Sequence, residues 1–253
     1  MPFFVSFSCY LSVLACKSNI YYNQKMECNI YKRAIQTQRD LYERLDLTPF
    51  PSDIPLRHVG GTDVSYSRTG KYSTAYAGIV VLEFGTWKVL DRVYASRDIS
   101  FPYIPGLLSF RELPVLLDAY EKLSLLPDLW LVDGAGIAHP RRMGLATHLG
   151  IILDQPTIGV AKSRLTGTHY DVGTEKGSIT GLYDRNELVG SVVRTRTNVR
   201  PLYISPGNRV SVEQAPELVL SCCTKYRLPE TTRAAHNLVT EIRKEHSHGK
   251  EYN

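Results

Sequence analysis

Residues 128–134 read DLWLVDG, an uninterrupted apolar run that ends on an aspartate and a glycine. A run of this kind is typical of a strand that is buried on both faces of an α/β sheet. Just before it, residues 109–123 repeat apolar side chains at helical spacing. The two patterns together predict a helix that leads into a central strand.

Upstream of this pair the chain is rich in Val, Ile and Tyr, which favour strands. Three segments are separated by Gly, Ser and Thr turns: RHVGGTDVSY (57–66), AYAGIVVLEF (75–84) and WKVLDRVYAS (87–96). Their spacing predicts an antiparallel meander. A helix over residues 27–45 and a proline-rich connector, TPFPSDIP (48–55), should precede them.

Downstream of the central strand, helical and strand patterns alternate. We expect a helix from about Pro140 to Leu153, a second buried strand in PTIGVAK (156–162), a hairpin over 177–195, and helices near 211–225 and 229–245. The whole pattern predicts one α/β domain over residues 26–248. Its mixed sheet, an antiparallel meander followed by parallel strands, would be flanked by helices.

The composition is that of a globular protein, with 253 residues, 43% hydrophobic and 22% charged. A formal charge of +5 permits a polyanionic partner without requiring one. The five cysteines lack zinc-site spacing and fit reduced thiols in a cytoplasmic protein. No stretch approaches the roughly 20 apolar residues that span a bilayer, so we expect no membrane partner.

The N-terminus is apolar and has no Lys or Arg before Lys17, so it lacks the basic start of a secretory signal. The segment Val13 to Cys16 faintly resembles a lipoprotein cleavage box, which is the alternative interpretation. Because Met26 begins a polar, helix-like segment, we interpret residues 1–25 as an extension upstream of the true start, outside the fold.

Two aspartates stand in strand-like surroundings. Asp63 lies within GGTDVSY, and Asp133 ends the run LWLVD. A buried carboxylate has to be protonated, paired or bound to a cation. On neighbouring strands the two would form a magnesium site. The alternative is that Asp133 caps the following turn while Asp63 pairs with a lysine or an arginine.

Glu112 has two interpretations. Ser109 to Glu112 fits the capping box S-x-x-E, in which the glutamate bonds back to the start of its own helix. Taken alone, the pattern favours the cap. A functional role requires the helix start to face Asp63 and Asp133, where a third carboxylate would complete a hard-oxygen site.

Several basic residues could contact phosphate. Arg141 and Arg142 follow Pro140 in the predicted first helical turn, where the helix dipole disfavours cations and an external anion would relieve the conflict. Arg194 and Arg196 should share one strand face. The alternative for all four is a solvated surface.

Two more polar residues are ambiguous on chemistry alone. Lys162 ends the strand PTIGVAK, where an ion pair with a carboxylate is the plain explanation. His236 lies in RLPETTRAAH on a predicted helix, and a lone helical histidine is more often a surface residue than a catalyst.

The segment FPYIPG (101–106) places Tyr103 between two prolines. Each proline fixes its own φ and pushes the residue before it towards an extended conformation. A ring held this stiffly suits either insertion into a ligand or a tight turn.

Taken together, these motifs resemble the ordered motif set of the endonuclease V family over residues 58–240: GGTDVSY, FPYIPGLLSFRE, LVDGAGIAHPRRMGLATHLG, PTIGVAKSRL, PLYISPGNRVSV and RLPETTRAAH. The resemblance implies an RNase H-like fold and a Mg²⁺-dependent DNA repair endonuclease, with Mn²⁺ as a substitute. It implies hydrolysis of the second phosphodiester bond 3′ to deoxyinosine, which leaves 3′-hydroxyl and 5′-phosphate ends.

The resemblance also implies roles for single residues. Asp63, Glu112 and Asp133 would be catalytic and hold the metal. Lys162 and His236 would also be catalytic: Lys162 would sit beside the scissile phosphate, and His236 would serve the acid-base or the metal-water side of the reaction. The strand-separating wedge would comprise Pro102, Tyr103, Ile104 and Pro105. The lesion pocket would comprise Gly106, Leu108, Gly134, Gly136, His139 and Gly144.

Two positions depart from the family pattern. Ala135 stands where the D-G-x-G motif usually has His or Asn, and Asn208 replaces the histidine of S-P-G-H-R. A binder that has lost turnover through Ala135 is therefore one alternative. An inosine-directed endoribonuclease is another, because the fold can accommodate a 2′-hydroxyl and the sequence does not show the sugar contacts. We expect a monomer whose partner is DNA containing deaminated purines, with inosine-containing RNA as the rival substrate.

Overall fold

The computed structural model describes residues 20–248 except 54 and 70–71. Three strands form the predicted antiparallel meander: β1 (His58–Thr69), β2 (Tyr72–Glu83) and β3 (Val89–Asp98). The central strand of DLWLVDG is β4 (Leu129–Val132), and PTIGVAK forms β5 (Thr157–Ala161). Both run parallel to β1, as predicted, because a helix-containing crossover precedes each of them.

The sheet continues beyond β5 with three antiparallel strands: β8 (Leu202–Asn208), β7 (Glu187–Val193) and β6 (Ile179–Asp184). The full order is β3-β2-β1-β4-β5-β8-β7-β6. The predicted hairpin is β6–β7. Strand β8 is not predicted, because Pro206 and Gly207 look like turn residues. They sit at a register shift between β5 and β8, where a proline is tolerated inside a sheet.

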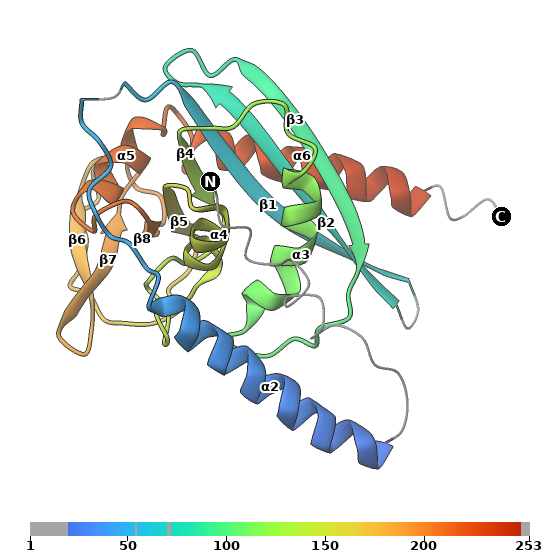
Figure 1. Cartoon of the computed structure of the whole chain (residues 1–253). Coiled ribbons are helices and arrows are strands. Elements are labelled where there is room, and N and C mark those ends of the chain that lie inside the picture. The colour runs from blue at the N-terminus through green and yellow to red at the C-terminus, as the bar shows by residue number, and fades with distance from the viewer. Residues whose placement is uncertain (1–19, 54, 70–71, 249–253) are drawn as a thin grey trace.

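Helices cover both faces of the sheet (Figure 1). On one face, α3 (Leu108–Tyr120) and α4 (Leu145–Leu153) pack against Trp130 and Val132 of β4. On the other face, α5 (Gln214–Ser221) packs on β4 and β5, and α6 (Glu230–His248) packs on β2. The predicted mixed α/β fold is confirmed.

Helix α2 (Ile20–Tyr42) lies outside this three-layer core, along the lower edge in Figure 1. Leu41 packs against Met143 and Ile151, which ties the end of α2 to α4. The boundary predicted between residues 25 and 26 falls inside α2, and residues 1–19 of the predicted extension lie outside the described residues. Across the described part of the chain, no helix combines the length and the apolar character needed to cross a membrane.

Two predicted elements are wrong in extent. The helix expected from Pro140 begins only at Leu145, because residues 134–144 form a loop in which Arg142 adopts a left-handed backbone with φ of 57°. Arg141 and Arg142 are therefore not in a helical turn. Strand β7 ends at Val193, so Arg194 and Arg196 do not share a strand face.

Candidate active site

Asp63 and Asp133 lie side by side because the parallel register of β1 and β4 pairs Thr62 with Val132, the residues just before them. The pairing of the two strands ends at Thr62 and Val132, where β4 stops and β1 continues. The amide of Asp133 donates to the carbonyl of Thr62 at 3.3 Å. The carboxyl end of a parallel strand is where α/β sheets commonly open a crevice. Asp63 and Asp133 therefore stand at this end of the parallel pair.

His236 reaches Asp63 from α6. Gly61 lets the helix approach β1 closely, since a Cβ on it would lie 2.2 Å from the backbone of Thr231. Further along α6, the Nδ1 atom of His236 lies 2.7 Å from Oδ2 of Asp63. The helical histidine that looks ordinary in sequence is therefore a direct partner of a buried carboxylate.

Glu112 arrives from α3 on the other face of the sheet. Its carboxylate is buried, and Oε1 accepts a hydrogen bond of 2.7 Å from the hydroxyl of Tyr66. The predicted capping box is wrong. Leu107 is the N-cap residue, and the hydroxyl of Ser109 lies 2.9 Å from Nδ1 of His148. Glu112 is consequently available to the site and not to its own helix end.

Lys162 follows β5 directly and donates a short hydrogen bond from Nζ to Oδ2 of Asp133. The pair is only partly shielded, with 39% of the lysine side chain and 18% of the aspartate side chain exposed. The ion pair predicted as the non-catalytic interpretation of Lys162 is therefore present. It also places a partly exposed cation beside the carboxylates.

The three carboxylates disturb one another electrostatically. Burial raises the pKa of Asp63 to about 6, with a further rise from the charge of Asp133, while His236 and Lys162 oppose the shift. Burial likewise raises the pKa of Glu112 to about 7, against the hydrogen bond from Tyr66 and with the charges of Asp133 and Asp63 adding to it. An added cation would relieve this repulsion.

The donor chemistry fits a hard divalent ion. All three acids offer oxygen ligands. Asp63 and Glu112 are buried, although a charged carboxylate is more stable in water. No three His, Cys, Asp or Glu side chains of the described residues form a ready-made metal cage. Magnesium characteristically binds through one or two carboxylates, water and substrate phosphate, so an incomplete protein shell suits it.

The loop around Tyr103 is anchored at both ends and exposed in the middle. Phe101 and Leu107 are buried, whereas 69% of Tyr103 is exposed. The amide of Leu107 donates to the carbonyl of Ile104 at 2.9 Å, and Gly106 has φ of 78°, as a type II turn with proline before glycine requires. This rigid turn presents the ring of Tyr103 to the surroundings.

The members of the predicted wedge differ in exposure. Pro102 and Pro105 are exposed beside Tyr103, but Ile104 is half-buried against a cluster that includes Ala34 of α2 and Phe101. Ile104 therefore anchors the loop. Only the tyrosine and the two prolines are presented outwards.

The residues predicted for the lesion pocket lie at the base of this loop and in the 134–144 loop. A Cβ on Gly136 would lie 2.1 Å from the carbonyl oxygen of Pro206, and one on Gly144 would lie 2.2 Å from that of Ala135. These two glycines are thus required by backbone packing. Gly134 approaches Leu145, His139 is buried, and 39% of Leu108 is exposed.

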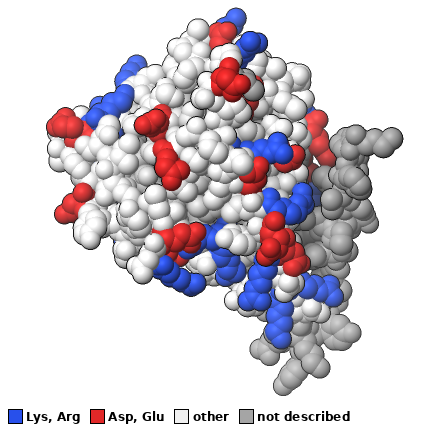
Figure 2. Space-filling view, turned by 60° about the vertical axis from the view of Figure 1, so that its left-hand side comes forward, with Lys and Arg blue, Asp and Glu red and all other residues white. Residues whose placement is uncertain are grey.

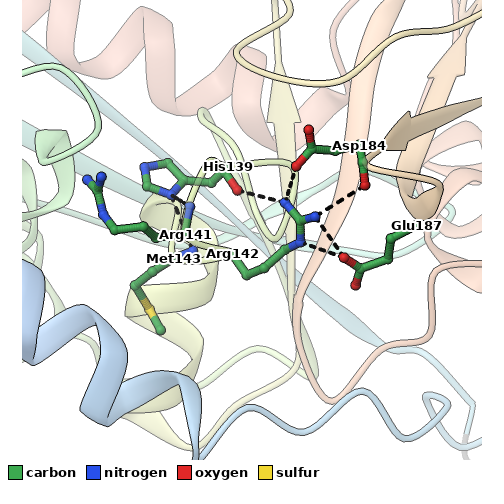
Figure 3. Close-up of polar contacts among 6 residues, drawn as sticks. All are labelled: His139, Arg141, Arg142, Met143, Asp184 and Glu187. Carbon is green, nitrogen blue, oxygen red and sulfur yellow. Dashed lines mark hydrogen bonds and ion pairs between the residues drawn. The ribbon is translucent and has the colours of Figure 1, made fainter.

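Arg142, a predicted phosphate contact, is held by partners within the fold. Its guanidinium pairs with Asp184 at 2.8 Å and Glu187 at 2.7 Å, and also donates to the carbonyl of His139 (Figure 3). Arg194 likewise donates to three backbone carbonyls, those of Val172, Gly173 and Val199. Both arginines are occupied within the fold.

The other two predicted phosphate contacts differ from these. Arg196 is exposed, and Arg141 bonds only neutral oxygens, those of Gln38 and Gly106. On the face shown in Figure 2, Lys and Arg gather towards the lower part and are interspersed with Asp and Glu. No broad area of one charge marks that face among the described residues.

The sequence gives no signal for the role of Tyr66, and the structure gives Asn208 partners that the sequence does not reveal. Tyr66 sits in the same strand as Asp63, but an ordinary strand tyrosine gives no signal that its hydroxyl holds Glu112. Asn208 is buried, accepts from the amide of Asp46 at 3.2 Å and donates to the carbonyl of Gly150 at 3.2 Å. This departure from the family pattern therefore serves packing between α4 and the segment after α2.

Comparison with known proteins finds a family model, relatives and solved structures that are similar to this chain. The family model for endonuclease V matches residues 39–237. The endonuclease V of Roseiflexus sp. (strain RS-1) is 51% identical over 189 residues, which is 75% of this chain and 83% of that protein. The crystal structure of endonuclease V from Streptomyces avermitilis has 40% identity and a TM-score of 0.79, covering 85% of this chain and 94% of that one.

A further solved structure contains nucleic acid. It is Ciona intestinalis endonuclease V in complex with a 24mer DNA containing an inosine followed by a ribo-adenosine. This chain shares 27% identity with it at a TM-score of 0.71, over 88% of this chain and 99% of that one.

Proposed function

Because this chain belongs to the endonuclease V family, we propose that it is a DNA repair endonuclease directed at deoxyinosine. The reaction is hydrolysis of the second phosphodiester bond on the 3′ side of the lesion, and it leaves 3′-hydroxyl and 5′-phosphate ends. The observation that carries the proposal is the adjacency of Asp63 and Asp133 at the end of the paired β1 and β4, with Lys162 and His236 bonded to them. Glu112, from α3, is near enough for the charges of both aspartates to raise its pKa.

The cofactor we propose is Mg²⁺, for which Mn²⁺ substitutes. Asp63 and Asp133 would be its principal ligands, with Glu112 as the third acid. When bound, the ion would supply positive charge that promotes deprotonation of water and offsets charge on the phosphate oxygens. The repulsion among the carboxylates, which adds to the effect of burial on the pKa of Asp63 and Glu112, supports this assignment.

Lys162 and His236 would complete the reacting centre. Lys162 is partly exposed and bonded to Asp133, so it can turn its ammonium towards a phosphate oxygen once a cation neutralises the aspartate. His236 uses Nδ1 to contact Asp63 and has 51% of its side chain exposed. This contact fixes the ring and would leave Nε2 to exchange protons with water or with the leaving oxygen.

The wedge would recognise the lesion by opening the helix. Inserting an aromatic side chain costs a few kcal/mol of base stacking, and the cost is lowest at a mispaired or damaged base. Tyr103 is exposed on a turn fixed by two prolines, which suits this role. The opened base would lie near Gly106, Leu108 and the 134–144 loop.

The decisive experiment is a nicking assay on matched short duplexes, each with one deoxyinosine or one inosine, in magnesium and in calcium. We expect a nick two bonds 3′ to deoxyinosine in magnesium and loss of nicking in Asp133→Ala. Faster cleavage of the RNA would assign the chain to the inosine-directed ribonucleases. Binding without nicking would assign it to non-catalytic binders and give Ala135 a functional consequence.

A further inference from the structure

The turn over residues 104–107, directly after Tyr103, is called the wedge turn. The carbonyl oxygen of Gly106 in this turn is held by three separate donors. Nη2 of Arg141 donates at 2.6 Å, Nε2 of Gln38 donates at 3.1 Å, and Nε2 of His139 lies at 3.1 Å. Nδ1 of His139 accepts from the amide of Arg141, which leaves the ring proton on Nε2 as a donor to the same carbonyl. A single backbone oxygen thus accepts three hydrogen bonds.

Gln38 links this oxygen to the N-terminal helix. Its side chain, from α2, is 0% exposed and uses both ends of its amide. Nε2 also donates to the carbonyl of Met143 at 3.2 Å, and Oε1 accepts from Nε of Arg141 at 2.5 Å. One buried amide therefore joins α2, the wedge turn and the 134–144 loop.

Arg141 and Arg142 are neighbours with opposite surroundings. Figure 3 shows the Arg142 guanidinium directed at Asp184 and Glu187, while that of Arg141 lies on the far side of the loop. Within the described part of the chain, Arg141 forms no salt bridge. A half-buried cation held only by neutral acceptors depends on their placement, which makes the Gln38 oxygen more important for its orientation.

We propose that Gln38 is a positioning residue for the wedge. By orienting Arg141 and bonding Gly106 directly, it fixes the end of the turn that carries Tyr103, and so sets the distance from wedge to carboxylates. Packing supports the link, because Ala34, one turn earlier in α2, lies in one apolar cluster with Phe101 and Leu107 at the two ends of that loop. The inference rests on the proposed function.

The test compares Gln38→Leu with Gln36→Leu. Gln36 lies on the same helix, is exposed and bonds Asp40 through its side chain, so it is a matched control. The first readout is the fluorescence of 2-aminopurine placed beside deoxyinosine in a duplex, measured in calcium. Unstacking by the wedge should raise the fluorescence with wild type and Gln36→Leu, and much less with Gln38→Leu.

The second readout is nicking in magnesium. Gln38→Leu should raise the KM for deoxyinosine duplexes about tenfold, as expected when a buried partner of several polar groups is removed, and change single-strand cleavage little. In a Tyr103→Ala background the same substitution should have no further effect on duplexes, because the part it positions is gone.

Three outcomes would overturn the inference: equal losses on duplex and single strand, full additivity with Tyr103→Ala, or a wild-type fluorescence rise in Gln38→Leu. If Gln38→Leu does not fold, Arg141→Lys replaces it, since lysine keeps the charge but lacks the fork that spans Gln38 and Gly106. Absence of nicking by wild type would contradict the proposed function instead, and the fluorescence comparison would still test the positioning role.

Discussion

Two charged clusters in this molecule follow opposite rules. Around Arg142, one cation with 12% of its side chain exposed meets two carboxylates and two carbonyls. Around Asp133, Lys162 pairs with that aspartate and also acts on Asp63, while burial raises the pKa of Asp63 and Glu112. The first cluster is complete in itself. In the second cluster negative charge exceeds the positive charge around it, which suits the proposed binding of a cation and a phosphate.

Charged residues that look alike in sequence differ in how fully their neighbours in the fold compensate their charge. Arg142 looks in sequence like a phosphate contact, and its full set of partners shows that the fold uses it. Asp63 looks like a candidate for a simple ion pair, yet its neighbours leave it partly uncompensated. Removing a charge should therefore weaken the fold in the first cluster and strengthen it in the second.

The largest effect is expected for Asp63→Asn. Loss of this proposed metal ligand should reduce nicking by at least about 1,000-fold, because the charge it would contribute is worth several kcal/mol at the transition state. Without divalent ions at pH 8, the same variant should unfold at higher temperature than wild type, since a buried charge next to Asp133 has been removed. Nicking assays and thermal unfolding in a chelator measure the two effects.

A lower unfolding temperature for Asp63→Asn would contradict the idea that buried, mutually repelling carboxylates destabilise the fold. Asp91 of β3 provides the matched control, because its carboxylate accepts hydrogen bonds from the amide and the hydroxyl of Ser124 and has no part in the cluster. Asp91→Asn should lose stability slightly and leave nicking unchanged.

The next effect is the pH dependence of Glu112→Gln. Folding raises the pKa of Glu112 from 4.5 to about 7, so between these values the folded protein holds a proton that the unfolded chain releases. Stability therefore falls as pH rises through this window. Glutamine removes the effect, and the variant should gain roughly 3 kcal/mol over wild type above pH 7 and little at pH 4.

Buried histidines act in the opposite direction and must be subtracted. Burial lowers the pKa of His139 to about 4 and that of His148 to about 3, so both stabilise the fold increasingly as pH rises towards 6.5. They are the same in both proteins, and the difference between the two urea unfolding curves isolates Glu112. A difference that does not grow with pH would contradict the raised pKa.

Local patterns are sufficient to predict most of the fold. The apolar run of β4 and the period of the strands before it predict the meander and the parallel strands, and the later strand pattern predicts the β6–β7 hairpin. Strand β8 is missed because Pro206 and Gly207 are turn residues in most contexts, and only the register shift opposite β5 accommodates them. A local pattern carries no information about such a long-range irregularity.

The site is predictable in part for a related reason. Asp63 and Asp133 stand out because carboxylates are unusual in apolar strands, and the structure brings them together. Glu112 matches a capping box that does not form, and Gln38 and Tyr66 look ordinary. Their roles depend on partners between 46 and 105 residues away in the chain, which no local pattern encodes.

In the Arg142 cluster, Asp184→Asn should have an intermediate effect. It leaves the guanidinium with one exposed carboxylate and two carbonyls, in a place where Asp184 has only 17% of its side chain exposed. Breaking a largely buried pair should cost about 2 kcal/mol of unfolding free energy, which urea unfolding measures. Nicking per folded molecule should stay at the wild-type level, because no carboxylate of the acidic cluster is touched.

The smallest effect is expected for Glu187→Gln in the same cluster. Glu187 bonds the same guanidinium, but 54% of its side chain is exposed, so water already screens the pair and solvates either residue. Its replacement should cost less than about 1 kcal/mol. Urea unfolding of the two variants side by side measures the ratio. Equal losses of unfolding free energy would mean that burial does not determine how much each ion pair of Arg142 stabilises the fold. The two clusters would then differ only in their balance of positive and negative charges.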